Sequence, residues 1–257
     1  MWKTSLFALA LGAPLLAASA QAAELTVFAT GSMADPLKEV GEDFTHRSGH
    51  TLKFVLGTTG AVMNRLKAGE KGDVIVISVE AADALQKDGK FLPGTRTDVA
   101  NSLFGATVKA GAPLPDISTP EAFKKAVLAA RTISYPDPIA AAASGGYLES
   151  LFRRLGIVDE ARKKAQLKPM GVAVGEAVAK GEAELGLSFA SEFVANKNLK
   201  VAIFPDAIQK PSLYTGGVFS DSKNADAAKA FLAFVTSPPA QVKLKAAGVD
   251  PVVATRQ

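Results

Sequence analysis

The sequence predicts an α/β protein of two units, called lobes here, each with a mostly parallel sheet flanked by helices. Between residues 25 and 89, short apolar runs alternate three times with segments of helical periodicity, as strands and helices do in a parallel sheet. Residues 72–78 form a nearly continuous apolar run, which is typical of a strand covered on both faces. The strands fall into two groups separated near Asn101 and Ser102, which favours two lobes over a single sheet.

The first 22 residues have the pattern of a secretory signal peptide. Lys3 supplies the positive start, residues 6–18 the apolar core, and residues 20–22 a small-residue cleavage site. The apolar core is too short to span a membrane. The chain has no cysteine that could carry a lipid anchor. We therefore expect cleavage near Ala22 and a mature protein that works in the periplasm.

Composition and motifs exclude several classes of function. The net charge is only +4, and the lysines are scattered among acids without a basic block, so we expect no nucleic-acid partner. The sequence contains no nucleophile elbow, P-loop or dinucleotide fingerprint, so we expect no cofactor. His46 and His50 have the spacing of two metal ligands on a helix, but Gly49 interrupts that helix and no further ligand lies nearby, so we expect no metal site.

The first lobe begins with a strand that leads into a helix. Residues 25–30 are largely apolar up to Gly31, and Leu37, Val40 and Phe44 then recur at helical spacing. The next strands are expected at 51–56 and 72–78, followed by helices over 61–69 and 81–87.

The rest of the chain shows the same alternation. Residues 118–121 combine hydroxyl caps, a proline in the first turn and an acid, which is typical of a helix start. Strands are expected at 104–109, 132–135, 183–189, 201–204 and 213–219, and helices at 120–130, 148–155, 175–180, 225–235 and 239–247. With crossovers near 100–105 and 205–215, residues 23–101 and 214–257 form lobe 1, and residues 102–213 form lobe 2.

Three strand-to-helix junctions are rich in hydroxyl-bearing and small residues. The first holds Gly31 and Ser32, the second Thr58 and Thr59, and the third spans residues 136–147. At the start of a helix, unpaired backbone N–H groups and the positive end of the dipole bind an anion without a cationic side chain. Each hydroxyl alone is also explained as an ordinary helix cap. Three junctions of the same kind favour an anion-binding cleft.

Four short segments carry a family resemblance. In their order and spacing, residues 29–33, 57–61, 71–74 and 181–186 resemble the type II periplasmic solute-binding proteins, most closely their molybdate-binding branch. This resemblance covers almost all of the mature chain. It implies two α/β lobes joined by crossover strands, a ligand cleft between them, and hinge closure on binding. It also implies a tetrahedral oxyanion held by hydroxyls and backbone amides of both lobes.

The resemblance assigns candidate ligand-binding residues. Gly31, Ser32 and either Thr58 or Thr59 would act from lobe 1. From lobe 2, backbone groups of residues 142–144 and near Val172 would act, which includes Ala143 and Ser144.

The chain also departs from the molybdate-binding pattern. Phe189 stands where those proteins supply a tyrosine hydroxyl. Arg65 follows the second junction by one helical turn, where it either grips a carboxylate through two hydrogen bonds or lies on the surface. Exported aconitate isomerases belong to the same branch, and this chain is similar to them at residues 64–66, 134–137, 143–145 and 213–214.

Two functions follow as hypotheses. The first is a monomeric exported solute-binding protein that captures a small anion, either a molybdate-like oxyanion or a small carboxylate, for the permease of an ABC importer. The alternative is a periplasmic isomerase of a small unsaturated polycarboxylate, in which Tyr135, Asp137 and Tyr214 are the candidate acid and base groups. Each of these three side chains is also explained by packing or turn chemistry.

Overall fold

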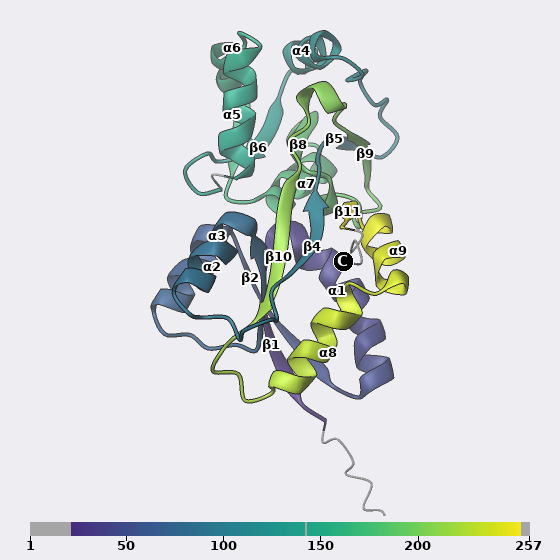
Figure 1. The fold of residues 1–257 in the computed structure, drawn as a ribbon. Coiled ribbons are helices and arrows are strands. Elements are labelled where there is room, and N and C mark those ends of the chain that lie inside the picture. Colours follow the sequence, from purple (N-terminus) through teal and green to yellow (C-terminus); the bar gives the residue numbers. More distant parts are fainter. Residues whose placement is uncertain (1–21, 142, 253–257) are drawn as a thin grey trace, which may run out of the picture.

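The computed structural model describes residues 22–141 and 143–252. The predicted signal peptide therefore lies almost wholly outside the described residues. The described chain forms two α/β lobes, one above the other in Figure 1, and this confirms the predicted fold class. Within the described residues, no helix combines the length and the apolar character needed to cross a membrane.

Lobe 1 is built on a sheet of six strands in the order β11-β4-β10-β3-β1-β2. Strands β1, β2 and β3 run parallel to one another, whereas β10 runs antiparallel to β3 and β4. The strands are β1 (Glu24–Thr30), β2 (Thr51–Gly57), β3 (Val74–Ser78), β4 (Thr97–Ser102), β10 (Ser212–Val218) and β11 (Val249–Pro251), and the helices are α1 (Gly31–Ser48), α2 (Thr59–Lys67), α3 (Val79–Lys87), α8 (Ala225–Val235) and α9 (Pro238–Ala246).

Lobe 2 is built on a sheet of five strands in the order β7-β6-β8-β5-β9. Strands β6, β7 and β8 are parallel, and β5 lies antiparallel between β8 and β9. The strands are β5 (Phe104–Lys109), β6 (Ile133–Pro136), β7 (Ala165–Lys168), β8 (Leu185–Phe189) and β9 (Leu199–Ile203), the helices are α4 (Pro120–Ala129), α5 (Ser144–Arg154), α6 (Val158–Lys163) and α7 (Gly171–Lys180), and the short 3-10 helices are η1 (Ala190–Glu192) and η2 (Asp206–Ile208).

Both sheets are mixed, where the sequence led us to expect mostly parallel sheets. The reason lies in the two connections between the lobes. Strand β4 leaves lobe 1 and is followed after one residue by β5 of lobe 2, while β9 leads back to β10. A strand that enters from the other lobe points away from the gap between the lobes. The parallel strands of its new sheet point toward that gap, so the entering strand pairs antiparallel with them.

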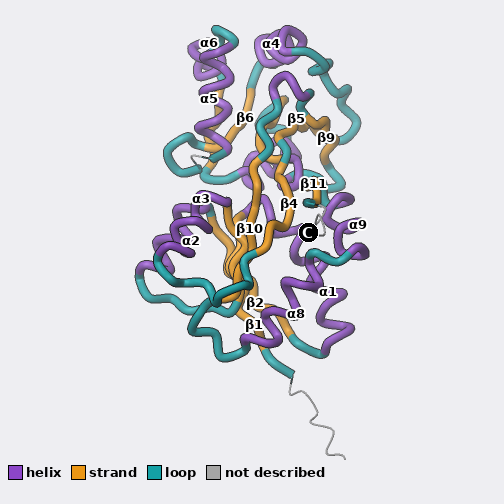
Figure 2. The backbone as a smooth tube through the Cα atoms, in the orientation of Figure 1, coloured by secondary structure: helices purple, strands orange, loops and turns teal. Residues whose placement is uncertain are grey.

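Each sheet is covered by helices on both faces, as the tube in Figure 2 shows for lobe 1. Along β3, Val74 and Val76 belong to the core under α1 and α8, whereas Ile75 and Ile77 belong to the core under α2 and α3. This alternation explains why the strand is apolar throughout. In lobe 2 the main core holds Phe104, Phe152 and their neighbours, and a smaller core lies beneath α7.

Candidate functional site

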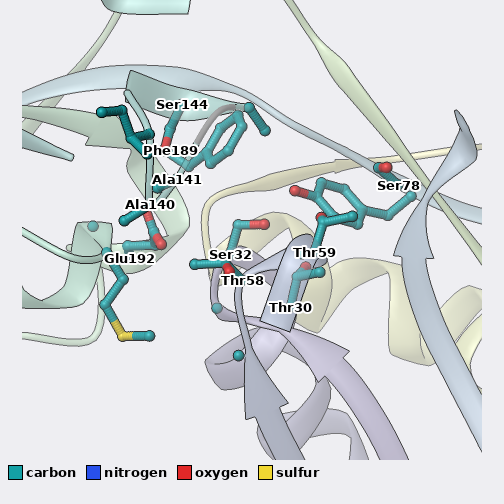
Figure 3. Close-up of a pocket in the computed structure, with 18 residues that line it drawn as sticks. Thr30, Ser32, Thr58, Thr59, Ser78, Ala140, Ala141, Ser144, Phe189 and Glu192 are labelled. Atoms are coloured by element: carbon teal, nitrogen blue, oxygen red, sulfur yellow. The ribbon is translucent and has the colours of Figure 1, made fainter. Parts of the chain in front are cut away.

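A cavity of about 270 Å³ lies between the lobes, at the carboxyl ends of the parallel strands of both sheets. Ligands of open α/β sheets commonly bind at this end of the strands, because the helices that follow begin there. Figure 3 shows the lobe 1 residues Thr30, Ser32, Thr58, Thr59 and Ser78 on one side of this cavity, and Ala140, Ala141, Ser144, Phe189 and Glu192 of lobe 2 on the other. We call this cavity the cleft.

Five helices begin at the cleft: α1, α2 and α3 from lobe 1, and α5 and α7 from lobe 2. Of these five, α2 alone has a capping side chain among the described residues: Thr58 Oγ1 accepts a hydrogen bond from the backbone N–H of Ala61 at 3.3 Å. Thr30 and Ser78 are of residue types that commonly cap, yet neither side chain caps the helix that follows it within the described chain. The first N–H groups of these helices are therefore available to a ligand.

Two hydroxyls of lobe 1 are buried without a well-formed partner. Thr30 and Ser32 are each 3% exposed, and the structure shows no hydrogen-bond partner for Thr30 Oγ1 or Ser32 Oγ among the described residues. Both lie beside the hydroxyl of Tyr214, whose pKa burial raises to about 12 while the two neighbouring hydroxyls oppose that shift. Buried polar atoms normally have partners. A ligand in the cleft could supply the missing hydrogen-bond partner for this group of three hydroxyls.

The lobe 2 side of the cleft is made of small residues, backbone and one carboxyl group. The loop before α5 contributes Ile139, Ala140 and Ala141, and α5 itself begins with the buried Ser144. Gly171 begins α7. Phe189 also lines the cleft, and its ring packs on Phe104 at 4.5 Å between centroids. Phe189 offers no hydrogen-bond donor, and the tyrosine of this cleft, Tyr214, comes from β10 of lobe 1 instead.

One ionisable acid and no cationic side chain line the described part of the cleft. Within the described residues, no lysine, arginine or histidine lines it, and its one ionisable acid is Glu192 at the end of η1. Burial of the carboxyl group raises the pKa of Glu192 to about 7, and the charge of Asp35 adds to the shift. Hydrogen bonds from Ser188 Oγ, at 2.6 Å, and from the backbone N–H groups of Phe189 and Gly171 oppose it. The carboxyl group therefore exchanges a proton near neutral pH.

The structure brings six of the predicted ligand-binding residues together. They are Gly31, Ser32, Thr58, Thr59, Ala143 and Ser144, and all of them line the cleft. The predicted Val172 is the second residue of α7 and lies outside the lining, which Met170 and Gly171 provide instead. Residue 142 lies outside the described residues.

The structure does not place Arg65 in the cleft. Its guanidinium donates two hydrogen bonds to the carboxylate of Glu70, from Nε at 2.6 Å and from Nη2 at 3.1 Å, on the exposed side of α2. This ion pair draws the side chain away from the helix start. The surface interpretation of Arg65 therefore describes its place in this structure.

The three predicted acid and base groups are separated in the structure. Tyr214 lines the cleft. Tyr135 is fully buried in the core of lobe 2, and its hydroxyl donates a hydrogen bond to Glu149 Oε1 at 3.1 Å. Burial also raises the pKa of Tyr135. Asp137 Oδ1 accepts a hydrogen bond from the backbone N–H of Ile139 at 2.7 Å, a turn contact outside the lining.

Sequence reasoning missed several residues of the lining. Ser78 and Thr30 end strands directly before helices, so the rule applied to Ser32 and Thr58 would also have identified them. Glu192 had no such signal, because it lies in a helical turn after β8 and has the charge that an anion site is expected to avoid. No cluster of three or more histidine or acidic side chains suited to a metal ion is present in the described part of the chain.

Comparisons with known proteins identify a family and relatives that cover nearly the whole chain. A family model described as bacterial extracellular solute-binding protein matches residues 25–250. An aconitate isomerase from a Pseudomonas species is 34% identical over 258 residues, which cover 96% of this chain and 97% of that protein. The molybdate-binding protein ModA of Azotobacter vinelandii is 26% identical over 247 residues, which cover 93% of this chain and 94% of that protein.

Solved structures share the same two-lobed fold. The periplasmic molybdate-binding protein of Azotobacter vinelandii superposes with a TM-score of 0.73 at 20% identity, over 88% of this chain and 98% of that one. The sulfate-binding protein SubI from Mycobacterium tuberculosis H37Rv gives a TM-score of 0.70 at 19% identity, over 90% and 88% of the two chains. At these identities the likeness establishes the fold alone, and the family model over residues 25–250 confirms the predicted family resemblance.

Proposed function

The chain belongs to the bacterial extracellular solute-binding proteins, and we propose that it captures a small anion in the cleft and delivers it to an ABC importer. The ligand is either a molybdate-like oxyanion or a small carboxylate. The observation that carries this proposal is the pair of buried hydroxyls of Thr30 and Ser32 at the start of α1, which have no well-formed hydrogen-bond partner in the described part of the chain. Around them, α3 and α5 also begin without a capping side chain among the described residues.

Neutral donors in a dry cleft bind an anion well. Hydrogen bonds to a charged group each contribute about 1.5–3 kcal/mol, because the charge strengthens them and the cleft excludes competing water. Helix starts add partial positive charge without a counter-ion that would have to be displaced. The absence of lysine and arginine from the described lining therefore fits anion capture.

The family suggests how capture would proceed. The two connections between β4 and β5 and between β9 and β10 would act as the hinge between lobe 1, residues 23–101 and 214–257, and lobe 2, residues 102–213. The protein would be exported with cleavage near Ala22, and would work in the periplasm as a monomer beside its transporter.

A panel of anions tests the proposal. Thermal unfolding would be recorded for the mature chain with molybdate, tungstate and sulfate, and with citrate, cis-aconitate and trans-aconitate. A ligand that binds the folded state raises the melting temperature with the logarithm of its concentration. We expect such a rise for one class of anion and none for sodium chloride at equal ionic strength. A flat response to all six anions contradicts the proposal.

A second candidate function is isomerisation of a small unsaturated polycarboxylate. The relative named aconitate isomerase favours it, at 34% identity over almost the full length of both chains. Tyr214 and Glu192 are the two ionisable groups on the described lining, and a carboxyl group with a pKa of about 7 is suited to accept and return a proton at neutral pH.

Conversion is separable from capture by a kinetic experiment. Trans-aconitate would be incubated with the mature chain and the products followed by proton NMR. Appearance of cis-aconitate at a rate proportional to protein concentration supports isomerisation. Binding of trans-aconitate with an unchanged spectrum excludes it and leaves capture.

A further inference from the structure

Glu192 holds a place between the two lobes. It ends η1 of lobe 2, and one oxygen of its carboxyl group lies toward each lobe. A Cβ atom built on Gly171, at the start of α7, would lie 1.7 Å from Oε2. A Cβ atom built on Gly31, at the start of α1, would lie 3.2 Å from Oε1. Glycine at both positions therefore lets the carboxyl group fit between two helix starts.

The two oxygens differ in their surroundings. Oε2 accepts the hydrogen bond from Ser188 Oγ at 2.6 Å, and the backbone N–H groups of Gly171 and Phe189 also donate to the carboxyl group. Oε1 lies beside Gly31, and the helix that begins there carries the Ser32 hydroxyl, which has no well-formed partner within residues 22–141 and 143–252. The anchored side fixes the orientation of the side chain, and the other side faces the place where an anion would bind.

An ionised Glu192 would repel an anion bound in the cleft. The titratable groups that influence Glu192 from the elements packed around it are Asp35 on α1 and Tyr214 on β10. From β8 and α7 come the uncharged donors Ser188 and the Gly171 N–H. An ionised Glu192 would thus meet a bound anion with no described cationic side chain in the lining to separate them. Two like charges in contact in a desolvated cleft repel strongly.

A proton on Glu192 removes this conflict. The neutral acid no longer repels the anion, and its O–H becomes one more donor to it. We propose that Glu192 binds the anion as a protonated donor, so that capture of an anion takes up one proton from solvent wherever the free carboxyl group was ionised. This inference rests on the proposed anion capture and deepens it. The reaction balances as carboxylate plus proton plus anion giving the carboxylic acid hydrogen-bonded to the anion.

The pH range of the effect follows from the carboxyl group. Because its pKa in the free protein is about 7, roughly half of the molecules carry the proton at neutral pH. Above that pH, the binding-competent fraction falls about tenfold per pH unit, and the apparent Kd rises by the same factor.

Calorimetric titration with molybdate and with trans-aconitate tests the inference. Both probes are fully ionised between about pH 6.5 and pH 9, so the protein supplies any pH dependence in that range. In the unaltered protein we expect the Kd to rise about tenfold per pH unit above pH 7. Glu192→Gln should bind with an affinity independent of pH, because the amide donates a hydrogen bond at every pH. The matched control is Glu176→Gln, which removes an exposed acid of α7 outside the cleft and should keep the slope.

Proton uptake gives a second readout that needs no variant. At about pH 8, titrations in two buffers of different ionisation heat should show about one proton bound per anion. Absence of uptake, or the same slope in Glu192→Gln as in the unaltered protein, overturns the inference while anion capture stands. If neither probe binds at any pH, this inference falls together with the proposed capture of these anions. If Glu192→Gln does not fold, the proton count decides alone.

Discussion

The two faces of the cleft are built from different chemistry. Lobe 1 presents six hydroxyl-bearing side chains, whereas lobe 2 presents small residues, backbone groups, the hydroxyl of Ser144 and the carboxyl group of Glu192. The hydroxyls of lobe 1 follow strands of a six-stranded sheet and are held in place before a ligand arrives. In the proposed binding mode, the hydroxyls of lobe 1 would hold the charge of the anion, and lobe 2 would add the proton of Glu192 as one more donor.

The largest effect on anion affinity is expected when hydrogen-bond donors are removed from the lobe 1 face. Ser32→Ala combined with Thr58→Ala should weaken anion binding by at least tenfold, and by more than about a hundredfold (about 3 kcal/mol) if both hydroxyls donate to the charge. Ser144→Ala is the matched change on the lobe 2 face and should cost less. Calorimetric Kd values for the three proteins decide. An unchanged Kd in the double variant would remove both residues from the binding site.

A substitution at Gly171 tests how firmly the lobe 2 face holds the carboxyl group of Glu192. A methyl group there would overlap Glu192 Oε2 at 1.7 Å and Ser188 Oγ at 2.3 Å, so Gly171→Ala must displace the anchored carboxyl group. We expect a loss of about 2–3 kcal/mol in the free energy of unfolding, measured by urea denaturation. Gly146→Ala is the control, since no atom lies within 4 Å of a methyl group at that helical position. Equal stability of the two variants would show that the carboxyl group moves freely.

Stability against pH probes the same carboxyl group without a ligand. Its pKa is raised from 4.5 to about 7 in the folded state, so the folded protein holds the proton more tightly than the unfolded chain. The resulting stabilisation is complete below about pH 4.5 and is lost as the pH rises through about 7. Relative to Glu192→Gln, the unaltered protein should lose up to about 3 kcal/mol across this range, because each pH unit between the two pKa values contributes about 1.4 kcal/mol. Parallel stability curves for the two proteins would contradict a raised pKa.

The smallest effect is expected at Arg65. Since its guanidinium pairs with Glu70 on the surface, Arg65→Ala should change the affinity for molybdate and for trans-aconitate by less than about twofold. A tenfold loss for trans-aconitate alone would show that Arg65 leaves Glu70 and reaches a carboxylate, which would make lobe 1 a cationic face. Glu70→Ala is the companion variant, because it frees Arg65 without removing it.

Local sequence patterns predicted most of the elements and part of the site. Alternating apolar runs and helical periodicity predicted the strands β1, β2 and β3 with the helices that follow, since these elements obey local rules of burial and capping. The hydroxyl-rich junctions at Ser32 and Thr58 follow from the same local rules. Strand β4 was missed because Thr97–Ser102 is largely polar and is stabilised by pairing with β10 and β11, which are distant in the chain.

Tertiary structure alone decided the mixed sheets, the departure of Arg65 and the place of Glu192. A chain that crosses between two sheets sets strand direction, and no local periodicity encodes that crossing. The desolvation that gives Glu192 its proton near neutral pH exists only where η1, α1 and α7 converge. Composition can name the residues that bear charge, but the free energy of a charge depends on the solvent that the folded chain removes from it.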